Sequence, residues 1–265
     1  MHWLWYILTG SCAGLFAGLF GVGGGIIIVP MLTFVFTSQL LPPLHIAHLA
    51  LGTSLATIMF TSVSSFRAHH GRGAVNWNVV KAISPGIVAG TFAGSWVAAN
   101  LSTQFLKGFF VVFLYYVALQ MLLGIRPAPH RELPGKVGMF SAGSVIGGIS
   151  SLVGIGGGSL SVPFLSWCNV PLLSAIGTSA AIGLPIAIAG AAGYITSGIA
   201  ADELPKWSLG FVYLPALLGV SIASICTAPL GARLAHTLPV GKLKKLFALL
   251  LIVMGTKLLG SLFGY

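Results

Sequence analysis

The chain has 265 residues, of which 56% are hydrophobic and only 6% are charged, against roughly 25% charged residues in an ordinary soluble domain. A water-facing surface cannot be built from this composition, which excludes a soluble globular protein. The 13 Lys and Arg residues outnumber the three acids and give a net charge of +10. In so apolar a chain these charges set the orientation of membrane loops, and no nucleic-acid partner is expected.

Apolar stretches near the length that spans a bilayer, about 20 residues, recur along the chain. They include residues 83–101, 105–123, 175–195 and 246–263. The sequence therefore predicts an all-α polytopic protein of the cell (plasma or inner) membrane, with the lipid bilayer as its surroundings. It does not set the oligomeric state, for which a homodimer is one arrangement.

The chain contains an internal repeat. Residues 14–32 align with residues 147–165, and nine of the nineteen aligned positions are identical, most of them glycines. Downstream, the tripeptide Gly-Thr-Ser at residues 52–54 aligns with the same tripeptide at 177–179, and Trp77 is paired with Trp207. Self-similarity of this kind indicates a duplicated unit. We therefore expect a first membrane repeat at residues 1–123, a cytoplasmic linker at 124–136 and a second membrane repeat at 137–265.

The glycine-rich part of each repeat decides how the chain crosses the membrane. Residues 4–37 would measure about 50 Å as one straight helix, which exceeds the whole bilayer, so this segment must break or turn back. A broken helix that crosses once gives parallel repeats, with eight Lys or Arg on one side and five on the other. A re-entrant hairpin gives inverted repeats and a split of ten to three. The positive-inside rule favours the second arrangement, in which each repeat has a glycine-broken re-entrant helical hairpin and three transmembrane helices.

The two glycine breaks are the predicted substrate site. Irregular backbone is tolerated at membrane depth only where protein buries it or where it lines a watery cavity. Residues 23–25 and 156–158 would expose N–H groups at the start of a half-helix, whose positive end attracts an anion. The alternative is that these glycines only let helices pack closely.

Hydroxyl groups in apolar segments supply further candidate ligands for an oxyanion. The Thr-Ser pairs at 53–54 and 178–179 offer uncharged donors, although each hydroxyl could instead bond its own helix backbone. Ser159 and Ser161 replace Ile26 and Ile28 of the first repeat, which makes the second-repeat side more polar. The predicted substrate-binding residues are Gly23, Gly24, Gly25, Thr53, Ser54, Gly156, Gly157, Gly158, Ser159, Thr178 and Ser179.

No enzyme chemistry is expected from this sequence. His45 and His48 have a helical spacing that two metal ligands could share, but the sequence offers no third ligand. The three carboxylates, Glu132, Asp202 and Glu203, all fall in predicted loops. No nucleophile with its base, carboxylate pair or phosphate loop is evident, so we predict no catalytic residues, no metal and no cofactor.

Two glycine segments followed by proline, each with a Gly-Thr-Ser element downstream, make the chain resemble the sulfite exporter TauE/SafE family of bacterial and archaeal membrane proteins. The matching positions are the glycines at 23–25 and 156–158 and the two Thr-Ser pairs, and the resemblance spans nearly the whole chain. It implies export of sulfite or of an organosulfonate such as sulfoacetate. The alternative is an importer or channel for another small solute.

The near absence of acids also bears on the energy source. Intramembrane Asp and Glu are the side chains that most often carry coupled protons or sodium, and none is predicted here. With the cell interior negative, each anionic charge that leaves gains about 2.3 kcal/mol per 100 mV. The membrane potential alone is therefore a sufficient driving force for export of an anion.

Overall fold

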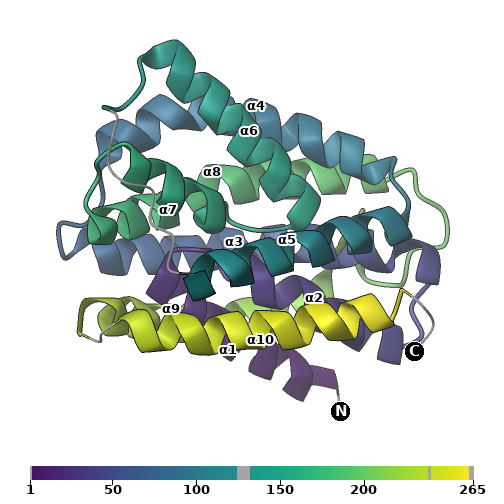
Figure 1. The fold of residues 1–265 in the computed structure, drawn as a ribbon. Coiled ribbons are helices and arrows are strands. Elements are labelled where there is room, and N and C mark those ends of the chain that lie inside the picture. Colours follow the sequence, from purple (N-terminus) through teal and green to yellow (C-terminus); the bar gives the residue numbers. More distant parts are fainter. Residues whose placement is uncertain (1, 124–131, 238–239, 263–265) are drawn as a thin grey trace.

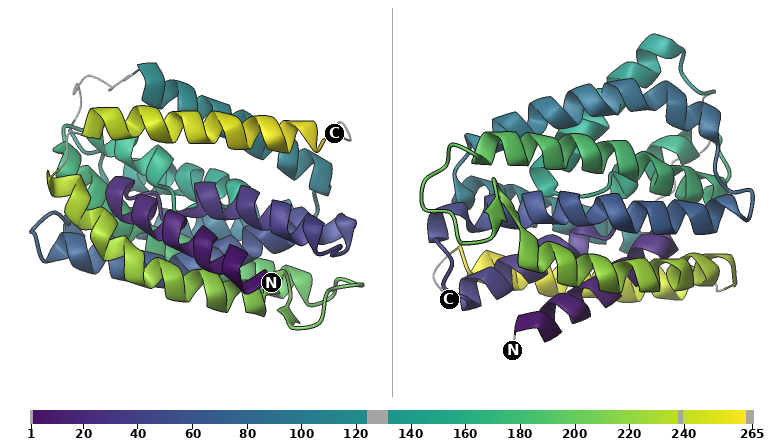
Figure 2. Two further views of the ribbon diagram at one scale, coloured as in Figure 1. Left: turned by 90° about the horizontal axis from the view of Figure 1, so that it is seen from below. Right: turned by 180° about the vertical axis from the view of Figure 1, so that it is seen from behind.

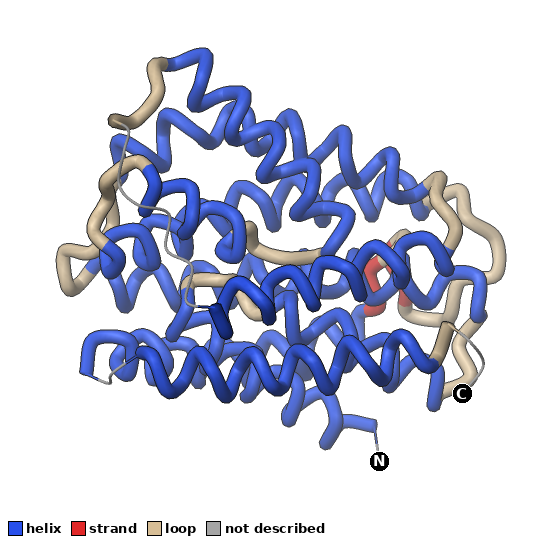
Figure 3. Tube along the Cα trace, in the orientation of Figure 1, coloured by secondary structure: helices blue, strands red, loops and turns tan. Residues whose placement is uncertain are grey.

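The computed structural model describes residues 2–123, 132–237 and 240–262. Most of them are helical, and a single short β-hairpin stands out in Figure 3. The elements are α1 (His2–Phe20), α2 (Gly25–Ser38), η1 (Pro43–His45), α3 (Ile46–His70), α4 (Trp77–Ala99), α5 (Thr103–Leu123), α6 (Lys136–Val153), α7 (Gly158–Trp167), α8 (Leu172–Gly198), β1 (Ser208–Leu209), β2 (Val212–Tyr213), α9 (Leu214–Thr237) and α10 (Val240–Gly260).

Among the described residues, seven helices are long and apolar enough to cross a membrane: α1, α3, α4, α5, α6, α8 and α9. The expected all-α polytopic architecture is therefore confirmed. α2 is a shorter apolar helix, and α10 carries four lysines and is not among the seven. Most of the predicted linker, residues 124–131, lies outside the described residues.

The glycine-rich segment does not form one long helix. α1 ends at Phe20, and α2 starts at Gly25 and runs back along it. The Tyr6 hydroxyl, near the start of α1, is 2.7 Å from Nε2 of Gln39, which follows the end of α2. Trp5 and Phe34 make an edge-to-face ring contact between the same two helices. The chain thus turns back at residues 21–24.

α3 and α8 lie antiparallel at the centre of the bundle and are the most buried of the long helices. Gly52, early in α3, packs against Tyr194, late in α8, while Gly177, early in α8, packs against Ala74, which follows α3. The pair α1–α9 lies on one side of this centre and the pair α4–α6 on the other (Figures 1 and 2). α5 and α10 pack against each other on a third face.

The two flanking pairs are held by close backbone contact. Gly10 and Gly14 of α1 face the carbonyl groups of Val220 and Ser224 on α9, and the α4–α6 pair repeats this contact. There Gly143 and Gly147 of α6 face the carbonyl groups of Ile83 and Ile87 on α4. Small residues at membrane helix interfaces allow such approach, because no side chain keeps the backbones apart.

These contacts correct one pairing made from the sequence. Because Gly10 of α1 corresponds to Gly143 of α6, Val220 corresponds to Ile83, which makes Leu214 rather than Trp207 the counterpart of Trp77. The segment between α8 and α9, residues 199–213, is longer than residues 71–76 between α3 and α4 and contains the β-hairpin. Trp207 belongs to this insertion, so its match to Trp77 was wrong.

A glycine substitution tests the close packing of α1 on α9. A Cβ atom at Gly18 would overlap the carbonyl oxygen of Ala228, so we expect Gly18→Ala to destabilise the protein by about 1–3 kcal/mol, as overpacking does. Gly108, inside α5, has no described atom within 4 Å of its Cβ position apart from its chain neighbours and the backbone of its own helix. Gly108→Ala should be neutral or stabilising by up to about 1 kcal/mol, through helix propensity. Thermal unfolding midpoints in detergent measure both, and equal midpoints for the two variants would contradict this packing.

Candidate functional site

The two glycine breaks meet inside the bundle. A Cβ atom on Gly23 would lie 3.0 Å from the Cα of Gly156, and one on Gly156 would lie 3.1 Å from the Cα of Gly23. Both distances are tighter than ordinary carbon contacts. Residues 21–25 and 154–158 are all buried. The structure therefore brings together the two segments that the sequence marks as the site, and glycine is needed for this approach.

Each break ends in a left-handed glycine that opens the next helix. Gly24 has φ 82° and precedes α2, and Gly157 has φ 74° and precedes α7; neither helix has a side-chain cap. The first backbone hydrogen bonds run from residues 27 and 28 to the Gly24 carbonyl, and from residues 160 and 161 to the Gly157 carbonyl. The N–H groups of residues 25–26 and 158–159 precede these bonds. They give both breaks the partial positive charge of a helix N-terminus.

Each break is fastened by a serine of the other half. Ser54 of α3 donates to the carbonyl oxygen of Gly154 at 2.7 Å, and Ser179 of α8 donates to that of Gly21 at 3.0 Å. All four residues are buried. The two bonds correspond to each other: in each, the Gly-Thr-Ser serine of one half donates to the first glycine of the break in the other half. Each Gly-Thr-Ser serine thus donates to the backbone of the opposite break and not to its own helix.

The neighbouring threonines form a second exchanged pair that points elsewhere. Thr53 accepts a hydrogen bond from the Tyr213 N–H and Thr178 accepts one from the Asn76 N–H, both at 2.9 Å. Tyr213 directly precedes α9 and Asn76 directly precedes α4. The threonine hydroxyls therefore hold the starts of these helices, and the structure does not bring them to the contact between the breaks.

The second break carries hydroxyls that the first lacks. Ser161 lies 2.7 Å, oxygen to oxygen, from Ser179 and bonds the Gly157 carbonyl at 2.9 Å. The Ser159 hydroxyl is buried with no hydrogen-bond partner among the described residues. Ile26 and Ile28 fill the corresponding positions in α2 and are fully buried. The expected polar asymmetry is therefore present in the packing.

Residues 6–258 match the protein family described as sulfite exporter TauE/SafE. The chain belongs to the sulfite exporter TauE/SafE family. A relative from Haemophilus influenzae, named "Probable membrane transporter protein", is 38% identical over 93% of this chain and 94% of its own length. Relatives with similar names from Methanocaldococcus jannaschii and Bacillus subtilis are 29% and 28% identical, over 94% and 96% of this chain and 92% and 98% of theirs. No solved structure matches the chain. The protein is thus a multi-pass membrane protein of a transporter family.

Three histidines of this TauE/SafE chain lie within hydrogen-bond distance of backbone carbonyl groups on other segments. His45 and His48 each bond a backbone carbonyl, at 3.1 Å to Asp202 and 3.0 Å to Leu101. His69 lies 2.8 Å from the carbonyl oxygen of Gly18, where its Nε2 must donate because a carbonyl only accepts. Within the described residues no three His, Cys, Asp or Glu side chains group together as metal ligands would.

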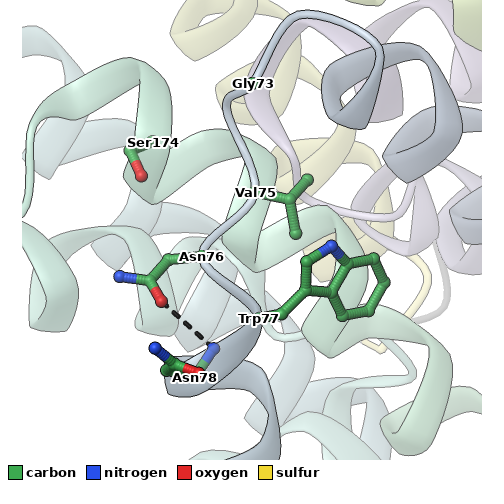
Figure 4. A pocket seen from close by; sticks show the side chains of 6 residues that line it. All are labelled: Gly73, Val75, Asn76, Trp77, Asn78 and Ser174. Atoms are coloured by element: carbon green, nitrogen blue, oxygen red, sulfur yellow. Dashed lines mark hydrogen bonds between the residues drawn. The ribbon is translucent and has the colours of Figure 1, made fainter.

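A cavity of about 400 Å³ opens beside the start of α4 (Figure 4). The lining residues are Gly73, Val75, Asn76, Trp77, Asn78 and Ser174. The Asn76 side chain caps α4 by accepting from the N–H groups of residues 78 and 79. The sequence interpretation missed this cavity. An asparagine directly before an apolar helix is a recognised cap signal, but nothing in the sequence brings Ser174 of α8 next to it.

The exchanged serine bonds can be tested by removing either hydroxyl. Ser54→Ala and Ser179→Ala each leave a buried carbonyl without its donor, which should lower the free energy of unfolding by about 1–3 kcal/mol. Thr196→Ala is the matched control, because the exposed Thr196 bonds only its own helix, and it should cost little. Unfolding curves in mixed detergent give all three values. If only one serine variant were destabilised, the two bonds would not be equivalent.

Proposed function

We propose that this TauE/SafE family protein exports a small anion, sulfite or an organosulfonate such as sulfoacetate, through the contact between its two glycine breaks. The observation that carries the proposal is the meeting of two buried helix N-termini at Gly23 and Gly156. Two positive helix ends facing one point attract an anion. Neutral N–H and hydroxyl donors also hold an anion loosely enough to release it.

Residues 1–123 and 137–265 are proposed as inverted membrane repeats joined by a cytoplasmic linker at 124–136. The antiparallel course of α3 and α8, which carry corresponding Gly-Thr-Ser elements, supports inversion, because parallel repeats would place these helices in the same direction. The hairpins α1–α2 and α6–α7 are then re-entrant, with their breaks meeting at one depth. This is the arrangement of many secondary transporters, whose substrate binds near the midplane at the repeat interface.

The distribution of basic residues supports the same orientation. The ends of α3 and α9 and the starts of α4, α6 and α10 lie at one end of the bundle (Figure 1). These segments, with the loop that joins α3 to α4, carry Arg67, Arg72, Lys81, Lys136, Arg233, Lys242, Lys244 and Lys245. Lys107, Lys206 and Lys257 belong to the other end. By the positive-inside rule the basic end is cytoplasmic. The cavity at Asn76 lies at this end and is therefore a candidate cytoplasmic entrance to the transport path.

Cysteine labelling separates inverted from parallel repeats. Leu40, after α2, and Asn169, after α7, are corresponding exposed positions that share left-handed backbone, with φ 56° and 61°. With Cys12, Cys168 and Cys226 replaced, we expect Leu40→Cys to react with an impermeant thiol reagent applied outside intact cells. Asn169→Cys should react only after the membrane is opened. Labelling of both from one side would favour parallel repeats.

Uniport driven by the membrane potential is the proposed energy source. The three carboxylates, Glu132, Asp202 and Glu203, all lie outside the helices, so no helix among the described residues offers an acid for a coupled cation. The gain of about 2.3 kcal/mol per charge at 100 mV corresponds to a concentration ratio of roughly fiftyfold. No coupling ion is needed for such a gradient.

Flux through proteoliposomes tests transport and its energy source together. Vesicles loaded with sulfite, sulfoacetate, taurine, thiosulfate or sulfate receive a potassium diffusion potential through valinomycin. We expect efflux of sulfite or sulfoacetate to accelerate when the lumen is negative and to slow when the potential is reversed. Loaded vesicles without the protein are the control. No flux of any panel anion would refute the proposed function. Flux that ignores voltage but follows a proton or sodium gradient would replace uniport by coupled transport.

A further inference from the structure

The two breaks have similar backbones but different surroundings. At the first, the carbonyl oxygen of Ala13 on α1 lies 2.8 Å from the Cβ position of Gly24, so backbone closes over the start of α2. At the second, the three atoms nearest to the corresponding position on Gly157 belong to side chains, those of Ile146, Ser150 and Ile186. α7 therefore begins against side chains of α6 and α8, and these decide what its N-terminus can hold.

Two buried hydroxyls without partners lie at the start of α7. Ser150 of α6 is 0% exposed, and its Oγ lies 3.4 Å from the Cβ position of Gly157, beside the N-cap. Ser159, in the first turn of α7, is 6% exposed. Within the described part of the chain neither Oγ has a hydrogen-bond partner. A buried hydroxyl without a partner is costly, and two of them beside free helix N–H groups point to an occupant that accepts hydrogen bonds.

The first break offers no such place. The counterparts of Ser150 and Ser159 are Ala17 and Ile26, both 0% exposed. Ile58 of α3 packs against both breaks, with Cγ2 3.1 Å from the Cβ position of Gly23 and 3.3 Å from that of Gly156. Its counterpart in α8 is Gly183, which has no side chain. Hydrocarbon side chains therefore meet both breaks, but the start of α2 lacks the two hydroxyls that lie at the start of α7.

We infer that the transported anion is held on one side of the contact between the breaks, at the start of α7, by the Ser150 and Ser159 hydroxyls and the N–H groups of residues 158 and 159. This inference rests on the proposed transport function and adds Ser150 to its site. In this arrangement the α2 side is a structural counterpart and not a second binding site. The glycine break of the first repeat supports the site through its contact at Gly23.

The donors also select the charge of the ligand. α7 and α8 contain no charged residue, and α6 has only Lys136, at its far end. Neutral donors satisfy the oxygens of an anion without neutralising it, and the cost of leaving water rises steeply with charge. The site therefore fits a monovalent oxyanion with several terminal oxygens, such as hydrogensulfite or an alkylsulfonate, and excludes sulfate.

Serine variants test this site better than glycine variants. Gly157 has a positive φ and its Cβ position overlaps the Ile186 side chain, so any substitution there strains the fold whether or not an anion binds. Ser150→Ala and Ser159→Ala remove one hydroxyl each and keep the helix. Binding of [³⁵S]sulfite to the full-length protein in nanodiscs, under anaerobic conditions, gives the dissociation constant. We expect each variant to raise it roughly tenfold, the usual effect of losing a hydrogen bond to a charged group.

Two controls separate binding from structure. Ser221 of α9 is also buried and has no hydrogen-bond partner among the residues that the structure describes. Because α9 packs on α1 and α3, Ser221→Ala should leave the dissociation constant unchanged. Ser150→Cys keeps the shape of serine but donates weakly, and it should lose affinity like alanine. If Ser150→Cys bound sulfite with native affinity, the shape of the side chain and not its hydrogen bond would explain the loss in Ser150→Ala. That result would overturn the assignment of Ser150 as a ligand. In the native protein, methanesulfonate should displace sulfite, whereas tenfold more sulfate should not.

The outcomes distinguish this inference from the proposed function. If the native protein neither binds nor transports any of the tested anions, the transport proposal fails. If it binds sulfite and both serine variants bind equally well, transport stands and the assignment to the start of α7 is overturned. Displacement by sulfate as effective as that by methanesulfonate would reject the selection for a monovalent anion.

Discussion

The rest of this structure depends on how two interrupted helices satisfy their backbone inside a membrane protein. A break leaves carbonyl groups without their helical partner, and hydrocarbon offers no replacement. Here the Gly21 and Gly154 carbonyls accept from Ser179 and Ser54, each from the other half. Each half therefore supplies a hydrogen-bond donor to a carbonyl group of the break in the other half.

Close helix packing is what allows the pair to meet. The glycines of α1, α4 and α6 bring backbones together in the two flanking pairs, and the central helices α3 and α8 then place their serines at the breaks. The same architecture leaves two helix N-termini beside the buried contact between the breaks. A positive helix end cannot be removed without unwinding the helix, so this electrostatic feature is fixed by the fold, and only the surrounding side chains differ between the halves.

Much of this organisation is predictable from the sequence, because a duplicated glycine pattern reports a backbone requirement directly. The break positions, the turning back of α2 and the more polar second half follow from residues 14–32 and 147–165. The partners of the Gly-Thr-Ser hydroxyls do not, since Ser54 bonds a residue one hundred positions away. The counterpart of Trp77 was misplaced because an insertion before α9 contains a second tryptophan by coincidence. Ser150 gives no signal in the sequence: a single serine in an apolar helix becomes notable only when packing denies it a partner.

The serine hydrogen bonds between the halves also affect the order in which the protein can complete its structure during synthesis. The Gly21 carbonyl group cannot accept its hydrogen bond until Ser179, 158 residues further along the chain, has been synthesised. At a synthesis rate of about 5–20 residues per second, the wait is on the order of ten to thirty seconds. During this time the first hairpin is already made, yet its break has no permanent donor. Until α8 is synthesised, water or the insertion machinery must donate a hydrogen bond to this carbonyl group. The first half therefore reaches its final hydrogen bonding only after much of the second half has been made.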